Sequence, residues 1–362
     1  MRYWKRALVI GFTLLIHPFF ELHLNAQSPT PNEPANEDRT LLRFELSVPA
    51  MGSHVDFVVY AHSESEAKKV IDAGLAEIER LSTVLSNYDP DSEISKICVS
   101  PKETSMPLSP DLARVLLHSR RWHQLSAGNF DITVGPLTQL WRAQRKKKQL
   151  PSHASLEDAM RRCGWLSVNL ELPAESEKPN QPTRISLLKD HMVLDLSGIA
   201  VGYIVDAAFE KMQTAGSNSI LINAGGDIRV GDAPPGAQGW KIAIAGLGKE
   251  SPPLSMLQLN NCAVTTSGDL NQCVEIDGRR YSHFIDPKSG APIERRQSVT
   301  VIAETTVDAD AGATTLAILG IQRASELFDG MPITNAVLVE TGPVDGPIRL
   351  RWLTNNRKPH SD

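Results

Sequence analysis

The order of apolar and polar positions along the chain predicts a mixture of helices and strands. Apolar residues cluster or alternate over residues 44–48 and 55–60, with Met51-Gly52-Ser53 between them, so two strands joined by a turn are expected. Apolar side chains then recur at helical spacing over residues 63–85 and 110–126, and Ser109 is placed to cap the second helix. Further helices are expected over residues 156–163, 201–215, 310–319 and 323–328.

The second half of the chain is dominated by short apolar runs that are typical of strands. They cover residues 185–196 (two strands around Lys189-Asp190), 219–230, 241–245, 257–266, 272–276, 298–303, 336–340 and 348–352. Several neighbours are joined by turns too short for crossover helices, which favours an α+β fold with mostly antiparallel sheets, flanking helices and a single large domain. Residues 128–135 are expected to form a loop, residues 145–150 a polar insert and residues 170–184 a mobile excursion.

The N-terminus has the pattern of an export signal. Arg2, Lys5 and Arg6 precede an apolar run over residues 7–20, and Leu24-Asn25-Ala26 is a plausible cleavage site. The pattern predicts an exported protein, periplasmic or otherwise extracytoplasmic, although an uncleaved anchor is the alternative. No cysteine lies near the cleavage site, so a lipid-modified N-terminal cysteine is excluded.

The segments after this signal are predicted from composition. Residues 1–26 form the signal peptide, and residues 27–40, rich in Pro, Asn and Glu, form a disordered linker. The folded domain is expected over residues 41–356, with a tail at 357–362.

Composition, charge and cysteine spacing give little support to a nucleic-acid-binding role or a zinc site. The 362 residues are 41% hydrophobic and 22% charged, with a formal net charge of −5, and the basic run over residues 145–148 is interpreted as a solvated face. A nucleic-acid role therefore has little support. The cysteines match no zinc spacing, and free buried thiols are expected, although Cys262 and Cys273 flank a possible hairpin and could meet.

Four loops combine glycine with a small polar residue or aspartate, and together they favour a nucleotide-like ligand. They cover residues 128–131, 197–202, 223–227 and 266–269. Glycine lets backbone N–H groups approach a phosphate closely, and residues 198–202 open a helix whose N-terminus favours anions. The spacing matches neither a dinucleotide-binding fingerprint nor a Walker A loop.

Two further features carry candidate chemistry but also have structural interpretations. His283 follows Ser282 in a strand-like segment and is either an acid–base residue or a hydrogen-bonded structural histidine. Asp310 and Thr314, four residues apart, share a helical face and offer hard oxygen atoms to Mg²⁺. From spacing alone, helix capping by the aspartate is the alternative. Asp308 is either a supporting carboxylate or the helix cap.

The ordered motifs resemble the FAD:protein FMN transferase family, called ApbE. The stretches that carry the resemblance are AMGS (50–53), LSNYDPDSEIS (85–95), GNFDITVGPL (128–137), DLSGIA (195–200), NAGGD (223–227), TTSGD (265–269), residues 281–290 and residues 310–320. They follow the family's order and cover about residues 43–355.

The resemblance implies a reaction and its participants. Members bind FAD and Mg²⁺ and transfer FMN to a threonine or serine hydroxyl of an acceptor protein, releasing AMP. The partners expected are therefore FAD and an exported acceptor, which can bring the enzyme near a membrane. The alternatives are a FAD pyrophosphatase, which yields FMN and AMP, and a non-catalytic exported FAD-binding protein.

The resemblance also assigns residues. The metal ligands map onto Asp310, Thr314 and the carbonyl of Gly198, while His283 is the expected general base, with Asp310 as the other catalytic residue. The FAD contacts map onto Met51, Ser86, Asn87, Asn129, Phe130, Asp131, Ser282, His283 and Ile285, and onto the position of Val201.

Val201 is a departure from the family, which usually has lysine, and sometimes glutamate, at this position. The valine removes a charge and a hydrogen bond toward the flavin nucleotide, which puts FAD affinity and rate in doubt. Lys241, Arg279 and Arg280 are the candidates to compensate. Transferase activity is nevertheless expected to survive.

Overall fold

The computed structural model describes residues 40–173, 182–248, 252–269, 272–341 and 346–355. The predicted signal peptide, all but the last residue of the predicted linker and the predicted C-terminal tail lie outside these ranges. Within them, no helix is both long and apolar enough to cross a membrane.

The described residues form seven α-helices and three short 3₁₀ helices. The α-helices are α1 (Glu64–Leu85), α2 (Glu93–Val99), α3 (Pro110–Leu125), α4 (Gly135–Lys147), α5 (His153–Arg161), α6 (Ala200–Ala215) and α7 (Thr306–Leu327). The 3₁₀ helices are η1 (Ile132–Val134), η2 (Trp165–Ser167) and η3 (Phe328–Gly330).

Fifteen strands accompany the helices in the same ranges. They are β1 (Leu42–Ala50), β2 (Ser53–Ala61), β3 (Met106–Pro107), β4 (Val168–Glu171), β5 (Arg184–Leu187), β6 (Ile220–Ala224), β7 (Asp227–Val230), β8 (Trp240–Ile244), β9 (Ser255–Leu259), β10 (Cys262–Gly268), β11 (Cys273–Ile276), β12 (Arg279–Ser282), β13 (Gln297–Ala303), β14 (Asn335–Glu340) and β15 (Arg349–Thr354).

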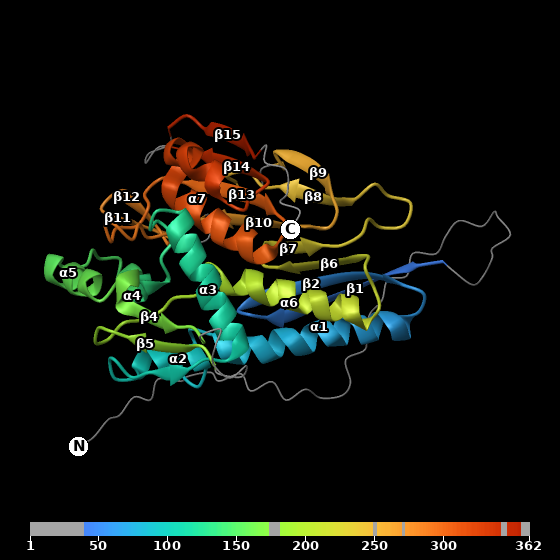
Figure 1. The fold of residues 1–362 in the computed structure, drawn as a ribbon. Coiled ribbons are helices and arrows are strands. Elements are labelled where there is room, and N and C mark those ends of the chain that lie inside the picture. The colour runs from blue at the N-terminus through green and yellow to red at the C-terminus, as the bar shows by residue number, and fades with distance from the viewer. Residues whose placement is uncertain (1–39, 174–181, 249–251, 270–271, 342–345, 356–362) are drawn as a thin grey trace, which may run out of the picture.

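An eight-stranded antiparallel sheet organises the domain. Its order is β1-β2-β6-β7-β10-β13-β14-β15, and α1, α6 and α7 cover one face (Figure 1). The other face carries the β8–β9 hairpin, whose Trp240 and Ile242 pack on Val58, Val230 and Val264. The predicted α+β class with mostly antiparallel sheets is confirmed, and the helical layer faces the larger core.

Two smaller units flank the end of the sheet at which the site lies. The strands β3, β5 and β4 form a three-stranded sheet, and β11–β12 is a separate hairpin. Leu137 and Trp141 of α4 pack against Ile276, Tyr281 and Ile285, which joins α4 to this hairpin. Residues far apart in the sequence thereby line one space.

Several predicted elements change at turns. The strand expected over 219–230 is two strands, because Gly225 and Gly226 both have positive φ and reverse the chain between β6 and β7. The strand expected over 257–266 is likewise split, with Asn261 at positive φ between β9 and β10. Of the two strands expected over 185–196, only β5 forms.

Helical residues also occur where loops were expected. Residues 128–135 include η1, and the predicted polar insert at 145–150 instead begins inside α4, which continues to Lys147. Part of the predicted excursion at 170–184 is ordered in β4 and β5, while residues 174–181 lie outside the described ranges. The four cysteines are free thiols, as predicted, but the expectation that they are buried is wrong: Cys98, Cys163 and Cys262 are partly buried and Cys273 is exposed.

Candidate active site

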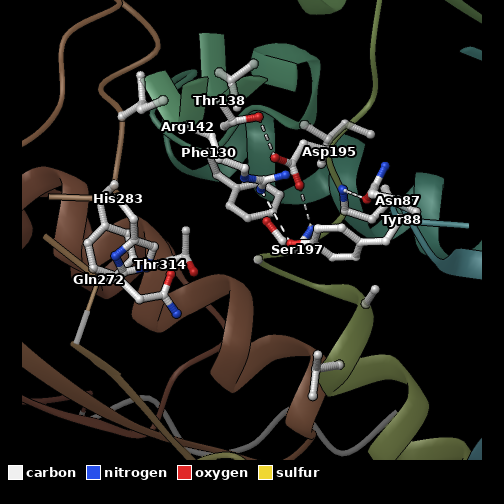
Figure 2. Close-up of a pocket in the computed structure, with 18 of the residues that line it drawn as sticks. Asn87, Tyr88, Phe130, Thr138, Arg142, Asp195, Ser197, Gln272, His283 and Thr314 are labelled. Atoms are coloured by element: carbon white, nitrogen blue, oxygen red, sulfur yellow. Dashed lines mark hydrogen bonds between the residues drawn. The ribbon is translucent and has the colours of Figure 1, made fainter. Parts of the chain in front are cut away.

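A cavity of about 720 Å³ opens where α4, α6 and α7 meet the β1–β2 turn and residues 282–287. This volume falls in the range of small-molecule and cofactor sites. Figure 2 shows His283, Gln272 and Thr314 on one side of the space, with Asp195, Ser197 and Tyr88 on the other.

The helix α7 reaches the cavity with both of its ends held by other elements. Thr305 caps the first turn, and the Asp206 carboxylate accepts hydrogen bonds from the backbone N–H groups of Thr306 (2.9 Å) and Val307 (2.8 Å). Helical geometry breaks at Gly320, and the Arg295 guanidinium donates to the carbonyl oxygen of Ile318 (2.8 Å) and to that of Ala317. The segment that bears Asp310 and Thr314 is therefore fixed at both ends.

Asp310 lies buried between α7 and α6 and does not itself line the cavity. Its Oδ2 accepts a hydrogen bond from the backbone N–H of Gly202 (3.2 Å). Burial raises the pKa of Asp310 well above its usual range, and the nearby Asp227 carboxyl adds to the effect. Burial likewise raises the pKa of Asp227 to about 6, although the Thr265 hydroxyl donates to its Oδ1 at 2.7 Å. A buried carboxylate without a basic partner is stabilised by a cation.

Thr314 and Gly198 face each other at the cavity wall. A Cβ atom built on Gly198 would lie 3.1 Å from Thr314 Oγ1, so glycine allows this close approach of the backbone. Both residues line the cavity. A hydroxyl, a backbone carbonyl and a buried carboxylate are hard oxygen ligands, so the three residues fit Mg²⁺. The described part of the chain contains no cluster of three or more His, Cys, Asp or Glu side chains suited to a metal.

His283 lies on the same side of the cavity as Thr314, on the loop after β12 (Figure 2). Its Nδ1 is buried and makes no hydrogen bond to the described residues. Burial, together with the positive charge of Arg145, lowers the pKa of His283 to about 4. The imidazole is therefore neutral at physiological pH and able to accept a proton.

The wall around Asp195 is built from hydrogen bonds within the protein. Asp195 Oδ2 accepts from the Thr138 hydroxyl (2.7 Å), and its Oδ1 accepts from Ser197 N–H (3.0 Å). The amide of Asn87 donates to the Leu194 carbonyl (2.6 Å) and accepts from Leu196 N–H (2.8 Å). These bonds fix the segment that leads into α6.

The comparisons with known proteins agree with this architecture. A sequence model of the ApbE family matches residues 51–338. The chain belongs to the ApbE family.

Two curated relatives and one solved structure illustrate how much of the chain is shared. The FAD:protein FMN transferase of Haemophilus influenzae is 29% identical over 310 residues, 82% of this chain and 86% of its own. That of Escherichia coli (strain K12) is 31% identical over 273 residues, 74% of this chain and 75% of its own. The apo structure of the flavinyl transferase ApbE from Pseudomonas stutzeri has a TM-score of 0.74 at 26% identity, covering 88% of this chain and 96% of that one. The predictions of the family and of a transferase enzyme are confirmed by these matches.

The structure brings most of the residues assigned through the ApbE resemblance to one cavity. Met51 lies in the β1–β2 turn at positive φ and reaches it, as do Ser86, Asn87, Phe130, Asp131, Gly198, Val201, Ser282, His283, Ile285 and Thr314. Their roles stay predictions.

Three of the assigned polar residues form hydrogen bonds to other residues of the protein. Asn129 lies behind the cavity, where its Nδ2 donates to the Ser126 carbonyl (2.6 Å) and its Oδ1 accepts from Arg323 (3.0 Å). Asp131 caps η1 by accepting from Thr133 N–H at 2.8 Å, and Asn87 is occupied as described above.

Asp308 is the unassigned carboxylate of the α7 segment. Its Oδ1 accepts a hydrogen bond from the buried indole N–H of Trp122 (2.9 Å), and Arg121 lies 3.6 Å away. The helix cap is Thr305 instead. Asp308 therefore joins α7 to α3 and is neither the cap nor a residue of the cavity wall.

Sequence reasoning missed several residues that line the cavity. They are Tyr88, Thr138, Arg142, Arg145, Asp195 and Gln272. Arg142 and Arg145 are three residues apart on α4, a spacing that places two side chains on one helical face. That spacing was the available signal, but the run at 145–148 was interpreted as solvated.

Proposed function

We propose that this ApbE-family chain is an exported, Mg²⁺-dependent flavin transferase that moves FMN from FAD onto a threonine or serine hydroxyl of an acceptor protein. The observation that carries the proposal is a single cavity lined by Gly198, Thr314 and the neutral ring of His283. The names of the relatives supply the donor and the class of acceptor.

The residues of this chain suit the transfer of a phosphoryl-linked group. The acceptor hydroxyl oxygen forms a bond to the phosphorus of the FMN half, the bond from that phosphorus to the bridging oxygen breaks, and AMP leaves with this oxygen. His283 takes the proton of the acceptor hydroxyl, since its ring is neutral and its Nδ1 has no partner among the described residues. Bound Mg²⁺ would neutralise charge on the pyrophosphate.

The metal would be held by Asp310, Thr314 and the Gly198 carbonyl. Among the described residues the carboxylate is buried without a basic partner, and the Gly198 backbone lies against the Thr314 hydroxyl. Hydrogen bonding to Gly202 keeps one oxygen of Asp310 oriented. Asp310 thus acts in catalysis through its charge and position.

The test is covalent flavin transfer. The full chain is incubated with FAD, Mg²⁺ and an exported acceptor domain, and the acceptor is examined by in-gel flavin fluorescence and mass spectrometry. We expect an added FMN mass on one threonine or serine, lost in Asp310→Ala and retained in the exposed control Asp329→Ala. If the chain releases AMP from FAD but transfers FMN to no tested acceptor, the result would favour the pyrophosphatase. Tight FAD binding without AMP release would favour a non-catalytic binding protein.

Export is proposed from the sequence alone. The basic and apolar residues of 1–26 support it, and acceptors outside the cytoplasm would suit an exported transferase. N-terminal sequencing of protein secreted from cells that express the full chain tests the cleavage after Ala26.

A further inference from the structure

The cavity has Val201 where the ApbE resemblance predicts a lysine, and none of the three expected substitutes lines it. Val201 is present at the wall, while Lys241 lies on β8 with its side chain exposed. Arg279 and Arg280 lie on β12 and are already engaged by carboxylates. The pairs are Arg279 with Glu294 and Arg280 with Asp269. The expectation that one of these residues compensates for Val201 gains no support.

Two other cations, on α4, do reach the cavity. Arg142 and Arg145 both line it, and the helix that carries them is anchored by Trp141, whose indole donates to the Gly290 carbonyl (2.8 Å). The Arg142 guanidinium lies over the Tyr88 ring, 5.3 Å from its centroid (Figure 2 labels both residues). Arg145 donates to the Gln272 carbonyl at 3.2 Å. The protein therefore holds both guanidinium groups at the cavity.

Neither arginine has an anionic partner. Within the described ranges, no carboxylate lies within salt-bridge distance of Arg142 or Arg145. Burial lowers the pKa of Arg145, and the charge of Arg142 lowers it further, as expected for two like charges on neighbouring turns. The electrostatic repulsion between the two guanidinium groups falls when an anion binds between them.

The position of the pair indicates which part of a ligand it meets. The helix α6 begins at Ala200, and Gly198, Ala200 and Val201 line the same cavity, so an N-terminal helix dipole also favours negative charge there. A pyrophosphate carries its negative charge on oxygen atoms that can accept paired hydrogen bonds from a planar guanidinium group. The flavin and adenosine parts of FAD are uncharged and gain little from two arginines.

We propose that Arg142 and Arg145 bind the pyrophosphate of FAD and take the place of the lysine that Val201 replaces. This inference rests on FAD as the substrate, as proposed above. Arg145 would serve a second purpose, because its charge also disfavours protonation of His283 and so keeps the general base neutral.

Equilibrium binding to the full chain tests the proposal without requiring transfer. The affinity for FAD is measured by isothermal titration calorimetry in the parent and in Arg142→Gln, Arg145→Gln and Lys147→Gln. Each arginine variant is expected to weaken FAD binding by about tenfold, the size of one charge-assisted hydrogen bond at a partly buried site. Lys147 lies on the same helix with an exposed side chain, so its variant controls for net charge and is expected to stay within about twofold.

Two further measurements separate pyrophosphate binding from other effects. Riboflavin, which lacks the pyrophosphate, should bind the parent and both arginine variants equally. Adding Val201→Lys to Arg142→Gln should restore most of the affinity for FAD, because it returns a cation to the same cavity. Melting temperatures report whether each variant is folded.

Several outcomes would overturn the inference. They are FAD affinities of the arginine variants within twofold of the parent, an equal loss in Lys147→Gln, or an equal loss for riboflavin. Failure of Val201→Lys to restore binding would contradict the replacement of lysine. If the parent binds FAD with these dependences but transfers no FMN, the proposed function fails and the arginine site stands. If transfer proceeds and the arginines make no difference, only the arginine site fails.

Discussion

Gly202 sits where α6 and α7 are closest, and its replacement by alanine is the sharpest test of how the site is held. A Cβ atom at this position would lie 2.5 Å from the carbonyl oxygen of Thr306 and 2.9 Å from Asp310 Cβ. Both neighbours belong to the same helix, and one is backbone, so no side-chain rotation removes the clash. The two helices must separate, which also lengthens the hydrogen bond from Gly202 N–H to Asp310.

The cost follows from these contacts. Overpacking of a close-packed core costs about 1–3 kcal/mol. Loss of a hydrogen bond to a charged group adds about 1.5–3 kcal/mol, and the better helix propensity of alanine returns up to about 1 kcal/mol. We expect Gly202→Ala to lower the free energy of unfolding by about 1.5–6 kcal/mol. For roughly 300 ordered residues, at about 2.1 cal/mol/K of unfolding entropy per residue, the melting temperature should fall by roughly 2–10 °C.

The assay combines thermal denaturation, followed by circular dichroism, with flavin transfer measured below the melting temperature. Folded Gly202→Ala should transfer FMN more slowly than the parent, because Asp310 is displaced from Thr314 and Gly198. Gly330→Ala is the matched control: its Cβ would meet nothing within 4 Å, so a change within about 0.5 kcal/mol is expected. A melting temperature for Gly202→Ala within 1 °C of the parent, on the order of the measurement error, would refute this account of the α6–α7 contact.

Three further predictions concern individual side chains of the site and of α7. The acid limb of kcat/KM should lie near pH 4, since the pKa of His283 is lowered to about 4 and its neutral form is active. Arg145→Gln should move that limb to higher pH, and a parent limb between pH 6 and 7, close to an unperturbed histidine, would contradict the role of His283. Asp308→Ala should cost about 1–3 kcal/mol because the buried indole N–H of Trp122 loses its acceptor, whereas Asp308→Asn, which keeps an oxygen, should cost less in denaturant titrations. Chelation of divalent cations should abolish transfer reversibly, and Thr314→Val should raise the Mg²⁺ concentration needed for half-maximal rate; equal Mg²⁺ dependence in the two proteins would count against the hydroxyl as a ligand.

The local sequence was enough to predict elements that are set by a few neighbouring residues, such as a turn or a helix cap. The β1–β2 hairpin follows from Met51-Gly52, where both residues have positive φ and form a two-residue turn. The helix α3 has Ser109 as its N-cap, accepting from Leu112 N–H at 3.3 Å, as its sequence indicates. The split between β6 and β7 was also visible in the glycine pair, but the surrounding apolar run masked it.

The cavity-lining arginines were beyond the reach of local pattern. Which face of α4 is buried depends on Ile276 and Tyr281, more than a hundred residues further along the chain. Without that packing, Arg145 cannot be separated from its exposed neighbours. Family motifs brought Gly198 and Thr314 to one cavity, yet they could not show that Asn129 turns inward toward Arg323.

The break at Gly320 divides α7 into two mechanically separate segments. The segment before it is clamped by Asp206 at its start and by Arg295 at its end. An inserted residue turns everything beyond it on a helix by about 100°. Inserted after Gly320, it would rotate only the short segment that follows and leave Asp310 and Thr314 facing α6. The same insertion directly before Asp310 would turn the Asp310 and Thr314 side chains away from Gly202 and Gly198, so tolerance to insertion along α7 should change abruptly at Gly320.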